Sequence, residues 1–150
     1  MNYVIKKFED LTTNELYEIL RVRAEVFVVE QDCVYQDLDL KDQKSYHLYC
    51  EENGEIVSYL RVIPCGISHS EVSIGRVLTR EEYRKKGISR ELMNRAIAFI
   101  TEELGEREIR ISAQAYLLGF YSSLGFTQVS DIYLEDGIEH AEMLYRKEEK

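Results

Sequence analysis

Residues 84–89, with the sequence RKKGIS, decide the fold because they mark a loop that leads into an amphipathic helix. Apolar side chains recur at helical spacing after Gly87, up to a stop near Gly105. The first turn of a helix has backbone N–H groups without intrahelical partners and a partial positive charge. A glycine at that point lets a bulky anion approach the backbone. The stretch therefore predicts an anion site, while a solvated basic helix start is the plain alternative.

Strands are predicted on both sides of this helix, over residues 71–79 and 108–113. A strand, a helix and a strand in this order predict a right-handed parallel crossover. Sheets of this kind bind ligands at the carboxyl ends of their strands, and residues 84–89 follow such an end. The sequence contains neither the GxxxxGK[ST] motif of nucleoside triphosphate sites nor the GxGxxG motif of dinucleotide sites.

The rest of the chain supplies the remaining parts of one sheet and its helices. Thr12 and Glu15 form a capping-box pattern at the start of a helix that runs to about Val29. Asn53-Gly54 and Asp136-Gly137 are two-residue turn patterns, and each predicts a β-hairpin. The other predicted elements are a strand over 1–7, a loop with a short helical turn over 30–45, hairpin strands over 46–51 and 55–63, a short helix over 116–124, and hairpin strands over 126–134 and 138–145. This order predicts one α+β domain over residues 1–150, with a mixed, mostly antiparallel sheet of about seven strands and helices on both faces.

The composition is that of an ordinary globular domain of 150 residues. The net charge of −9 argues against nonspecific nucleic-acid binding, since phosphate contacts need a cationic surface. No apolar run approaches the roughly 20 residues of a membrane span, and residues 1–10 carry no secretory signal. Cys33, Cys50 and Cys65 are odd in number and lack C-x-x-C spacing, which argues against disulfides and a zinc site. We expect a cytoplasmic protein with reduced thiols, no bound metal and no membrane or nucleic-acid partner.

Two motifs in the right order connect the chain to a known family. Residues 84–89 fit R-x-x-G-x-G/A with Ser89 in the last small position, and residues 120–126, FYSSLGF, fit F-Y-x-x-x-G-F. On these motifs the chain resembles the GNAT N-acetyltransferase superfamily. From about Leu11 to Tyr145 it is similar to the ElaA-like branch; the matching positions are residues 23–31, Tyr35, Asp39, Asp42, residues 75–77, residues 135–138 and His140.

The resemblance implies direct transfer of an acetyl group from acetyl-CoA to an amine of a small molecule or peptide. It assigns the acyl carbonyl and the pantetheine arm to Val77, Leu78 and Thr79, whose N–H groups would be free where two strands splay apart. It assigns the pyrophosphate to the turn before the helix, made by Arg84, Lys85, Lys86, Gly87, Ile88, Ser89 and Arg90. Gln114 stands where an asparagine of the family often contacts the cofactor, and a cap at its strand end is an equal alternative.

Tyr121 is the candidate general acid, on its position in the second motif. A phenol with an ordinary pKa of about 10 is matched to a thiolate of similar basicity, to which it would give a proton. The alternative is packing, because the chain has 11 tyrosines.

The acceptor side is less defined. Glu30, Asp39 and His140 are candidate substrate contacts, and together with Asp42 they are the candidate bases, although a water chain could replace a single base. The carboxylates at Glu30, Asp32, Asp37, Asp39 and Asp42 would attract a cationic amine, or they would form a solvated loop. Three arginines lie on predicted helix or strand positions: Arg23, Arg61 and Arg76. We expect them to pair with these carboxylates. The functional alternative is that Arg76 holds an anionic group of the acceptor.

A second function fits the same motifs. A non-catalytic module could keep the cofactor turn and use acyl-CoA binding for sensing or interaction. Tyr121 and the acidic acceptor side favour the enzyme. The sequence leaves the acceptor and the oligomeric state open, a homodimer included.

Overall fold

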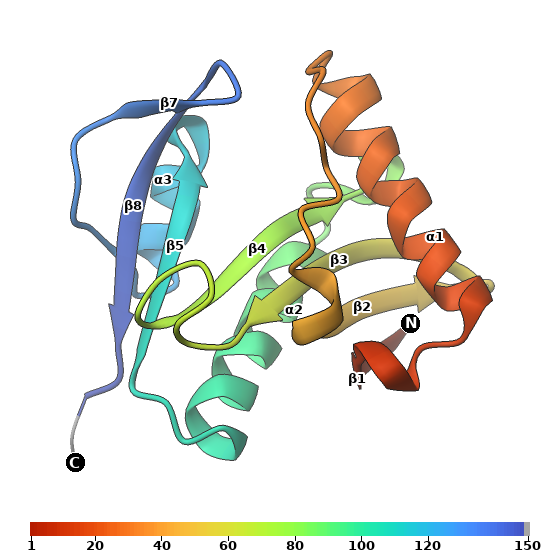
Figure 1. The fold of residues 1–150 in the computed structure, drawn as a ribbon, viewed down its shortest axis with the longest axis horizontal. Coiled ribbons are helices and arrows are strands. Elements are labelled where there is room, and N and C mark those ends of the chain that lie inside the picture. The colour runs from red at the N-terminus through yellow and green to blue at the C-terminus, as the bar shows by residue number, and fades with distance from the viewer. Residues whose placement is uncertain (149–150) are drawn as a thin grey trace.

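The computed structural model describes residues 1–148, and within them one mixed sheet of eight strands carries helices on both faces (Figure 1). The strands lie in the order β1-β2-β3-β4-β5-β8-β6, and β7 pairs with β8. Among the strands of residues 1–148, only β4 and β5 run parallel, as the strand–helix–strand pattern predicts. The bounds are β1 (Asn2–Lys7), β2 (Tyr46–Glu52), β3 (Glu55–Ile63), β4 (Val72–Thr79), β5 (Glu108–Gln114), β6 (Thr127–Gln128), β7 (Tyr133–Glu135) and β8 (Ile138–Arg146). The predicted α+β class is confirmed.

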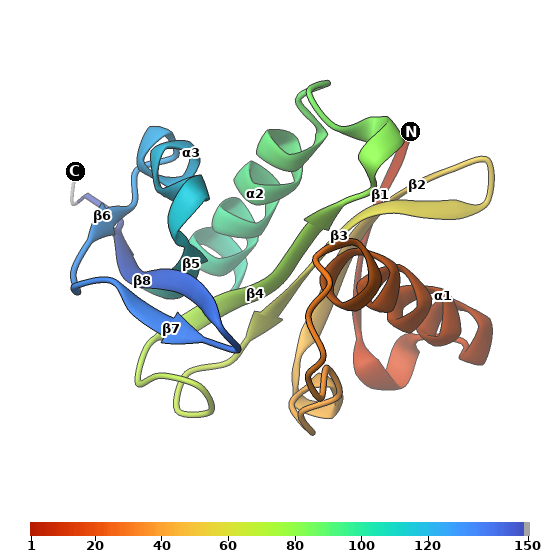
Figure 2. The same ribbon diagram turned by 90° about the horizontal axis from the view of Figure 1, so that it is seen from above.

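The two long helices lie on opposite faces of the sheet, as Figure 2 shows for α1 and α2. The capping box of α1 is confirmed, because Thr12 Oγ1 accepts from the Glu15 N–H at 3.1 Å and the Glu15 carboxylate accepts from the Thr12 N–H at 2.8 Å. Both long helices end in π-helical turns that no sequence pattern predicted. The helical segments are η1 (Phe8–Asp10), α1 (Thr13–Arg23) with η2 (Ala24–Glu30), η3 (Asp42–Lys44), η4 (Glu81–Tyr83), α2 (Ile88–Ala98) with η5 (Phe99–Glu103), η6 (Ala115–Leu117) and α3 (Leu118–Ser123).

Alternation of side chains along β3 divides the core into two layers. Leu60 of β3 belongs to the apolar cluster under α2, together with Leu92. Its neighbour Tyr59 belongs to the cluster under α1, together with Ile19. Successive side chains of a strand point to opposite faces, so β3 is apolar on both sides because a helix covers each.

The final hairpin differs from its prediction. Its turn has positive φ at both Asp136 and Gly137, as an Asp-Gly hairpin requires. The predicted single strand over 126–134 is wrong, because it is broken into β6 and β7. Four residues, 129–132, lie opposite only two residues of β8, and the Ser130 side chain accepts the bond from the Glu142 N–H at 2.8 Å. This break raises the strand number from the expected seven to eight.

Candidate active site

A bulge in β4 marks the point where the sheet opens. Tyr59 pairs with Leu78 and Arg61 pairs with Gly75, so two residues of β4 lie opposite one residue of β3. Arg76 sits in the bulge with a φ of 53°, a left-handed conformation that is uncommon outside glycine.

The pairing of β4 with β5 covers only two residue pairs, the last being Ser73 with Arg110. Beyond this pair the strands diverge, and the sheet opens like a V in Figure 1. Val77, Leu78 and Thr79 follow on β4 beside the opening. The predicted splaying of two strands at this position is confirmed.

The turn before α2 has the conformation that its glycine predicts. Gly87 is the N-cap of α2 with a φ of 80°, and Lys85 has a φ of 64°. In the described part of the chain no side chain caps this helix, so its first N–H groups are left for another partner. A Cβ atom at Gly87 would meet nothing within 4 Å, so the space over the turn is open. This geometry suits an anion at the start of α2.

The side chains of the turn have different surroundings. Arg84 makes two short contacts with the Glu30 carboxylate, at 2.6 and 2.8 Å, and its Nε donates to the Thr79 carbonyl at 2.8 Å. The Lys86 ammonium lies 5.5 Å from the centre of the Tyr83 ring. Arg84 therefore links the turn to the end of η2, and its charge is already paired.

The other polar groups of the turn lie nearer the opening. The Arg90 guanidinium donates to Ser123 Oγ at 2.9 Å and lies over the Phe120 ring. The Ser89 hydroxyl is hydrogen-bonded to the Thr79 hydroxyl. This last bond joins the start of α2 to the end of β4.

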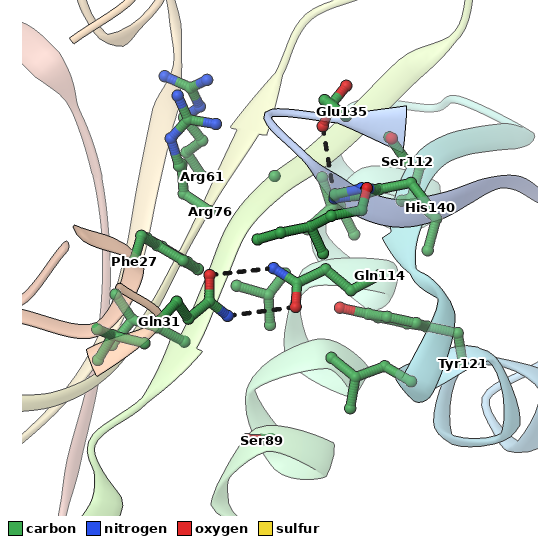
Figure 3. A pocket seen from close by; sticks show the side chains of 18 of the residues that line it. Phe27, Gln31, Arg61, Arg76, Ser89, Ser112, Gln114, Tyr121, Glu135 and His140 are labelled. Carbon is green, nitrogen blue, oxygen red and sulfur yellow. Dashed lines mark hydrogen bonds and ion pairs between the residues drawn. The ribbon is translucent and has the colours of Figure 1, made fainter. Parts of the chain in front are cut away.

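Tyr121 is buried on α3, with 5% of its surface exposed, and its hydroxyl points into the opening (Figure 3). Its ring packs edge-on against Phe120 and Phe126. Burial raises the pKa of this phenol above its ordinary value, so the group stays protonated at neutral pH. A protonated hydroxyl at this position can donate a proton to a leaving group.

Gln114 spans the opening with a partner that we did not single out from the sequence. Gln31 Nε2 donates to Gln114 Oε1 at 3.2 Å, and Gln114 Nε2 donates to Gln31 Oε1 at 3.4 Å. In the view of Figure 3 this amide pair lies between Arg76 and His140 on one side and Ser89 and Tyr121 on the other. The two residues are 83 positions apart, and no local pattern connects them.

His140 lies opposite Gln114 in the β5–β8 ladder. Its Nδ1 is 2.7 Å from the Ile138 carbonyl, which fixes Nδ1 as the protonated nitrogen. Its Nε2 lies 3.5 Å from the Glu135 carboxylate, and its ring stacks on Tyr133. The Asp136-Gly137 turn could have revealed the Glu135 contact, because the hairpin register brings both residues to one end.

The expected pairing of arginines with carboxylates of the 30–42 segment is confirmed. Arg23 is fully buried and binds Asp37 at 3.0 Å and Asp42 at 2.7 Å. Arg61 binds Asp42 at 2.9 Å and also pairs with Asp39. Burial acts to raise the pKa of Asp39, but the hydrogen bonds and charge of Arg61 outweigh it and hold that pKa below its ordinary value.

Arg76 completes this network from the bulge of β4. Its Nε donates to Asp37 Oδ1 at 2.8 Å, and its Nη2 lies 3.4 Å from Asp39 Oδ2. Three arginines thus face three aspartates, so these carboxylates are already paired and serve to hold the 30–42 segment against the sheet.

One cavity of about 1150 Å³ collects the predicted site residues. All of them line it except Lys86, including Tyr121, Gln114, Glu30, Asp39, Arg76 and His140. Sequence reasoning did not name Gln31, Ser112 or Glu135 as site residues, and these line it as well. The cofactor candidates and the acceptor candidates therefore share a single space.

Comparison with known proteins identifies the family. The model of the acetyltransferase (GNAT) domain matches residues 9–147. The chain belongs to the GNAT acetyltransferase family. A UPF0039 protein from Synechocystis sp. is 39% identical over 147 residues, covering 97% of this chain and 96% of the relative.

Two solved structures extend the GNAT assignment. An acyl-CoA N-acyltransferase from Pseudomonas aeruginosa is 37% identical with a TM-score of 0.91, covering 97% of this chain and 99% of that one. Escherichia coli ElaA is 33% identical with a TM-score of 0.91, covering 97% and 100%. The chain is an ElaA-like member of the family, and membership supports an acyl-CoA-dependent acyltransferase activity.

Two further observations concern membranes and metals. Within residues 1–148 no helix is long and apolar enough to cross a bilayer. In that same part of the chain, no three His, Cys, Asp or Glu side chains gather in a way that could hold a metal ion.

Proposed function

We propose that this protein is an N-acetyltransferase that moves an acetyl group from acetyl-CoA to a primary amine of a small molecule or peptide. The observation that carries the proposal is the single cavity in which the uncapped turn before α2, the opening between β4 and β5, and Tyr121 meet. A cofactor with an anionic end and a reactive thioester end needs these parts together.

On the cofactor side, the backbone of residues 85–90 would receive the pyrophosphate. The turn offers first-turn N–H groups and the positive end of α2, and Lys85 and Arg90 add charge beside the cavity. Arg84 acts differently, because its contacts with Glu30 and Thr79 hold the turn in place.

On the reaction side, Val77, Leu78 and Thr79 would receive the pantetheine arm and the acyl carbonyl. An N–H group aimed at the carbonyl oxygen stabilises the negative charge that develops there when the amine attacks. The amine nitrogen then forms the new bond to the carbonyl carbon while the carbon–sulfur bond breaks.

Two protons must move during this exchange. Tyr121 would give its proton to the departing CoA thiolate, because its hydroxyl points into the opening and is protonated at neutral pH. His140 would take the proton of the amine at Nε2, since Nδ1 is committed to the Ile138 carbonyl. A water chain through the polar cavity is the alternative route for the second proton.

The test measures acetyl-CoA binding and turnover separately. Calorimetry should show that acetyl-CoA binds, and a thiol reagent should then detect free CoA with a panel of polyamines, amino acids, aminoglycosides and peptides. Tight binding without acceptor-dependent CoA release across the panel would favour a non-catalytic acyl-CoA-binding module. A lack of acetyl-CoA binding would overturn both functions.

A further inference from the structure

The acceptor side of the cavity has a cationic wall. Lys41, Arg61 and Arg76 line this wall beside Asp39, the one aspartate of the arginine network that lines the cavity. The other two aspartates of the arginine network do not line the cavity. The network is balanced in charge, but two of its three arginines line the cavity and only one of its three aspartates does.

Two donors on this wall are not satisfied by the residues that the structure describes. The Nη1 of Arg76 makes no hydrogen bond there, because its contacts with the aspartates use Nε and Nη2. Arg61 is only 2% exposed, and its Nε is buried with no hydrogen-bond partner in residues 1–148. Gly75 faces this nitrogen with no side chain, since a Cβ there would lie 3.8 Å away. An anion in the cavity would accept a hydrogen bond from the free Nη1 of Arg76 and would be attracted by the positive charge of Arg61 behind it.

The opposite wall carries negative charge. Glu135, Asp136 and Glu142 line the cavity from the β7–β8 hairpin, next to His140. Glu142 already binds Arg110 at 3.1 Å, while Glu135 faces the His140 imidazole. Figure 3 shows Arg61 and Arg76 on one side of the space, with Glu135 and His140 across from them.

We infer that the acceptor is a zwitterion, a small amino acid whose carboxylate meets Arg76 and Lys41 and whose amine lies beside Glu135 and His140. The inference rests on the proposed acetyltransferase activity and names its substrate class. The amine belongs on the hairpin wall because His140 pairs with Gln114 at the end of β5, where the sheet opens to the thioester. A carboxylate binds an arginine with charge-assisted hydrogen bonds, and the free Nη1 of Arg76 supplies one.

This arrangement separates acceptor classes. A polyamine would place a second cation against the arginine wall, and like charges in a cavity repel. A simple amine would leave the arginine donors unpaired. A zwitterion satisfies both walls at once.

The experiment compares matched acceptors on the unchanged protein, with CoA release as the readout. Each amino acid, with α, β, γ or ε spacing between amine and carboxylate, is paired with its carboxamide and with the amine that lacks the carboxylate. At one spacing we expect kcat/KM for the amino acid to exceed that for its carboxamide by about tenfold or more. Carboxamides or polyamines that match or exceed every amino acid would overturn the inference while leaving the acetyltransferase activity intact.

Variants locate the effect in the protein. Arg76→Gln should raise KM for the preferred amino acid about tenfold and should lower kcat/KM for the amino acid far more than kcat/KM for its carboxamide. Lys41→Gln, which loses only a bond to Ser68, tests the same wall if Arg76→Gln does not fold. Arg146→Gln is the matched control, since Arg146 is exposed at the end of β8 and should change neither constant.

Three outcomes separate the inference from the activity on which it rests. An equal loss of kcat/KM for amino acid and carboxamide in Arg76→Gln would contradict a carboxylate contact. Unchanged kinetics in both wall variants would contradict it too. If acetyl-CoA binds and no acceptor of any class releases CoA, the acetyltransferase proposal fails first and the inference fails with it.

Discussion

The two sides of the cavity differ in the groups that form them: one is formed mainly by backbone and the other by side chains. The side that we propose binds the cofactor consists mainly of backbone: the bulge of β4, the opening after Ser73, and the turn at Gly87. The acceptor side consists of side chains held by ion pairs, and Arg23 is its buried centre. Backbone groups suit a cofactor that all members of a family share, whereas a side-chain network can be altered one residue at a time.

The largest effect should come from the centre of the acceptor side. Arg23→Ala should lower the free energy of unfolding by about 3 kcal/mol, because the variant removes one of the two arginine partners of Asp37 and Asp42 in a largely buried network. The value lies at the low end of the usual range because Asp37 and Asp42 each keep another arginine.

Chemical denaturation measures this change, and Arg21→Ala is its control. Arg21 lies two residues away on the same helix with 40% of its side chain exposed, so its loss should cost under about 1 kcal/mol. Equal losses in the two variants would show that the network does not hold the acceptor side.

The next largest effect concerns Tyr121, which lies between the two sides. Tyr121→Phe should lower kcat about 100-fold or more, as loss of a general acid does, with little change in acetyl-CoA affinity. Tyr145→Phe makes the same change in a ring that packs on Phe126 outside the cavity, and it should leave kcat unaltered. An unchanged kcat in Tyr121→Phe at saturating substrates would remove its catalytic assignment.

A smaller effect tests the backbone side. Gly87→Ala should raise the Kd for acetyl-CoA about tenfold, equivalent to about 1.4 kcal/mol, because a methyl group occupies the space over the turn. Gly105→Ala is a matched control at the far end of the same helical segment, since both glycines have positive φ and open space around the Cβ position.

Both variants should lose similar stability, about 1 kcal/mol, from backbone strain. Calorimetry with acetyl-CoA distinguishes them, because only Gly87→Ala should bind more weakly. Equal affinities would place the pyrophosphate elsewhere.

The smallest effect is a pH dependence behind the acceptor side. His47 is buried, with Nδ1 2.6 Å from the Tyr59 hydroxyl and Nε2 2.9 Å from the Asp42 carbonyl. Burial lowers its pKa below the ordinary 6.5, so the folded state binds fewer protons than the unfolded state. Stability from this group is therefore complete above pH 6.5 and is lost as the pH falls toward the folded pKa.

Unfolding measured at pH 7 and pH 5.5 should show a loss of about 1 kcal/mol. His47→Gln, which cannot titrate, should show a flatter dependence over the same range. Parallel curves would assign the pH dependence to other groups.

The same contrast explains how much could be predicted from the sequence. The turn at residues 84–89, the two hairpin turns and the parallel crossover depend on short patterns, and these predictions agree with the structure. The partners of Arg76 and Gln114 lie 39 and 83 residues away, so only the folded chain decides which carboxylate or amide each meets. At the break between β6 and β7 the Ser130 hydroxyl accepts from the Glu142 N–H, and no period in the sequence marks this exchange of a side chain for a strand partner.

The bulge at Arg76 adds one residue to β4, and this single residue matters for both the core and the cavity. Side chains on a strand alternate with a period of two, so deleting one residue there would exchange the two faces of residues 72–75. Val72 and Ile74 would leave the core layer under α2, and Ser73 would turn toward it. The single extra residue thus shifts the alternation of side chains along β4 by one position. Without it the chain could not keep both its core and its cavity.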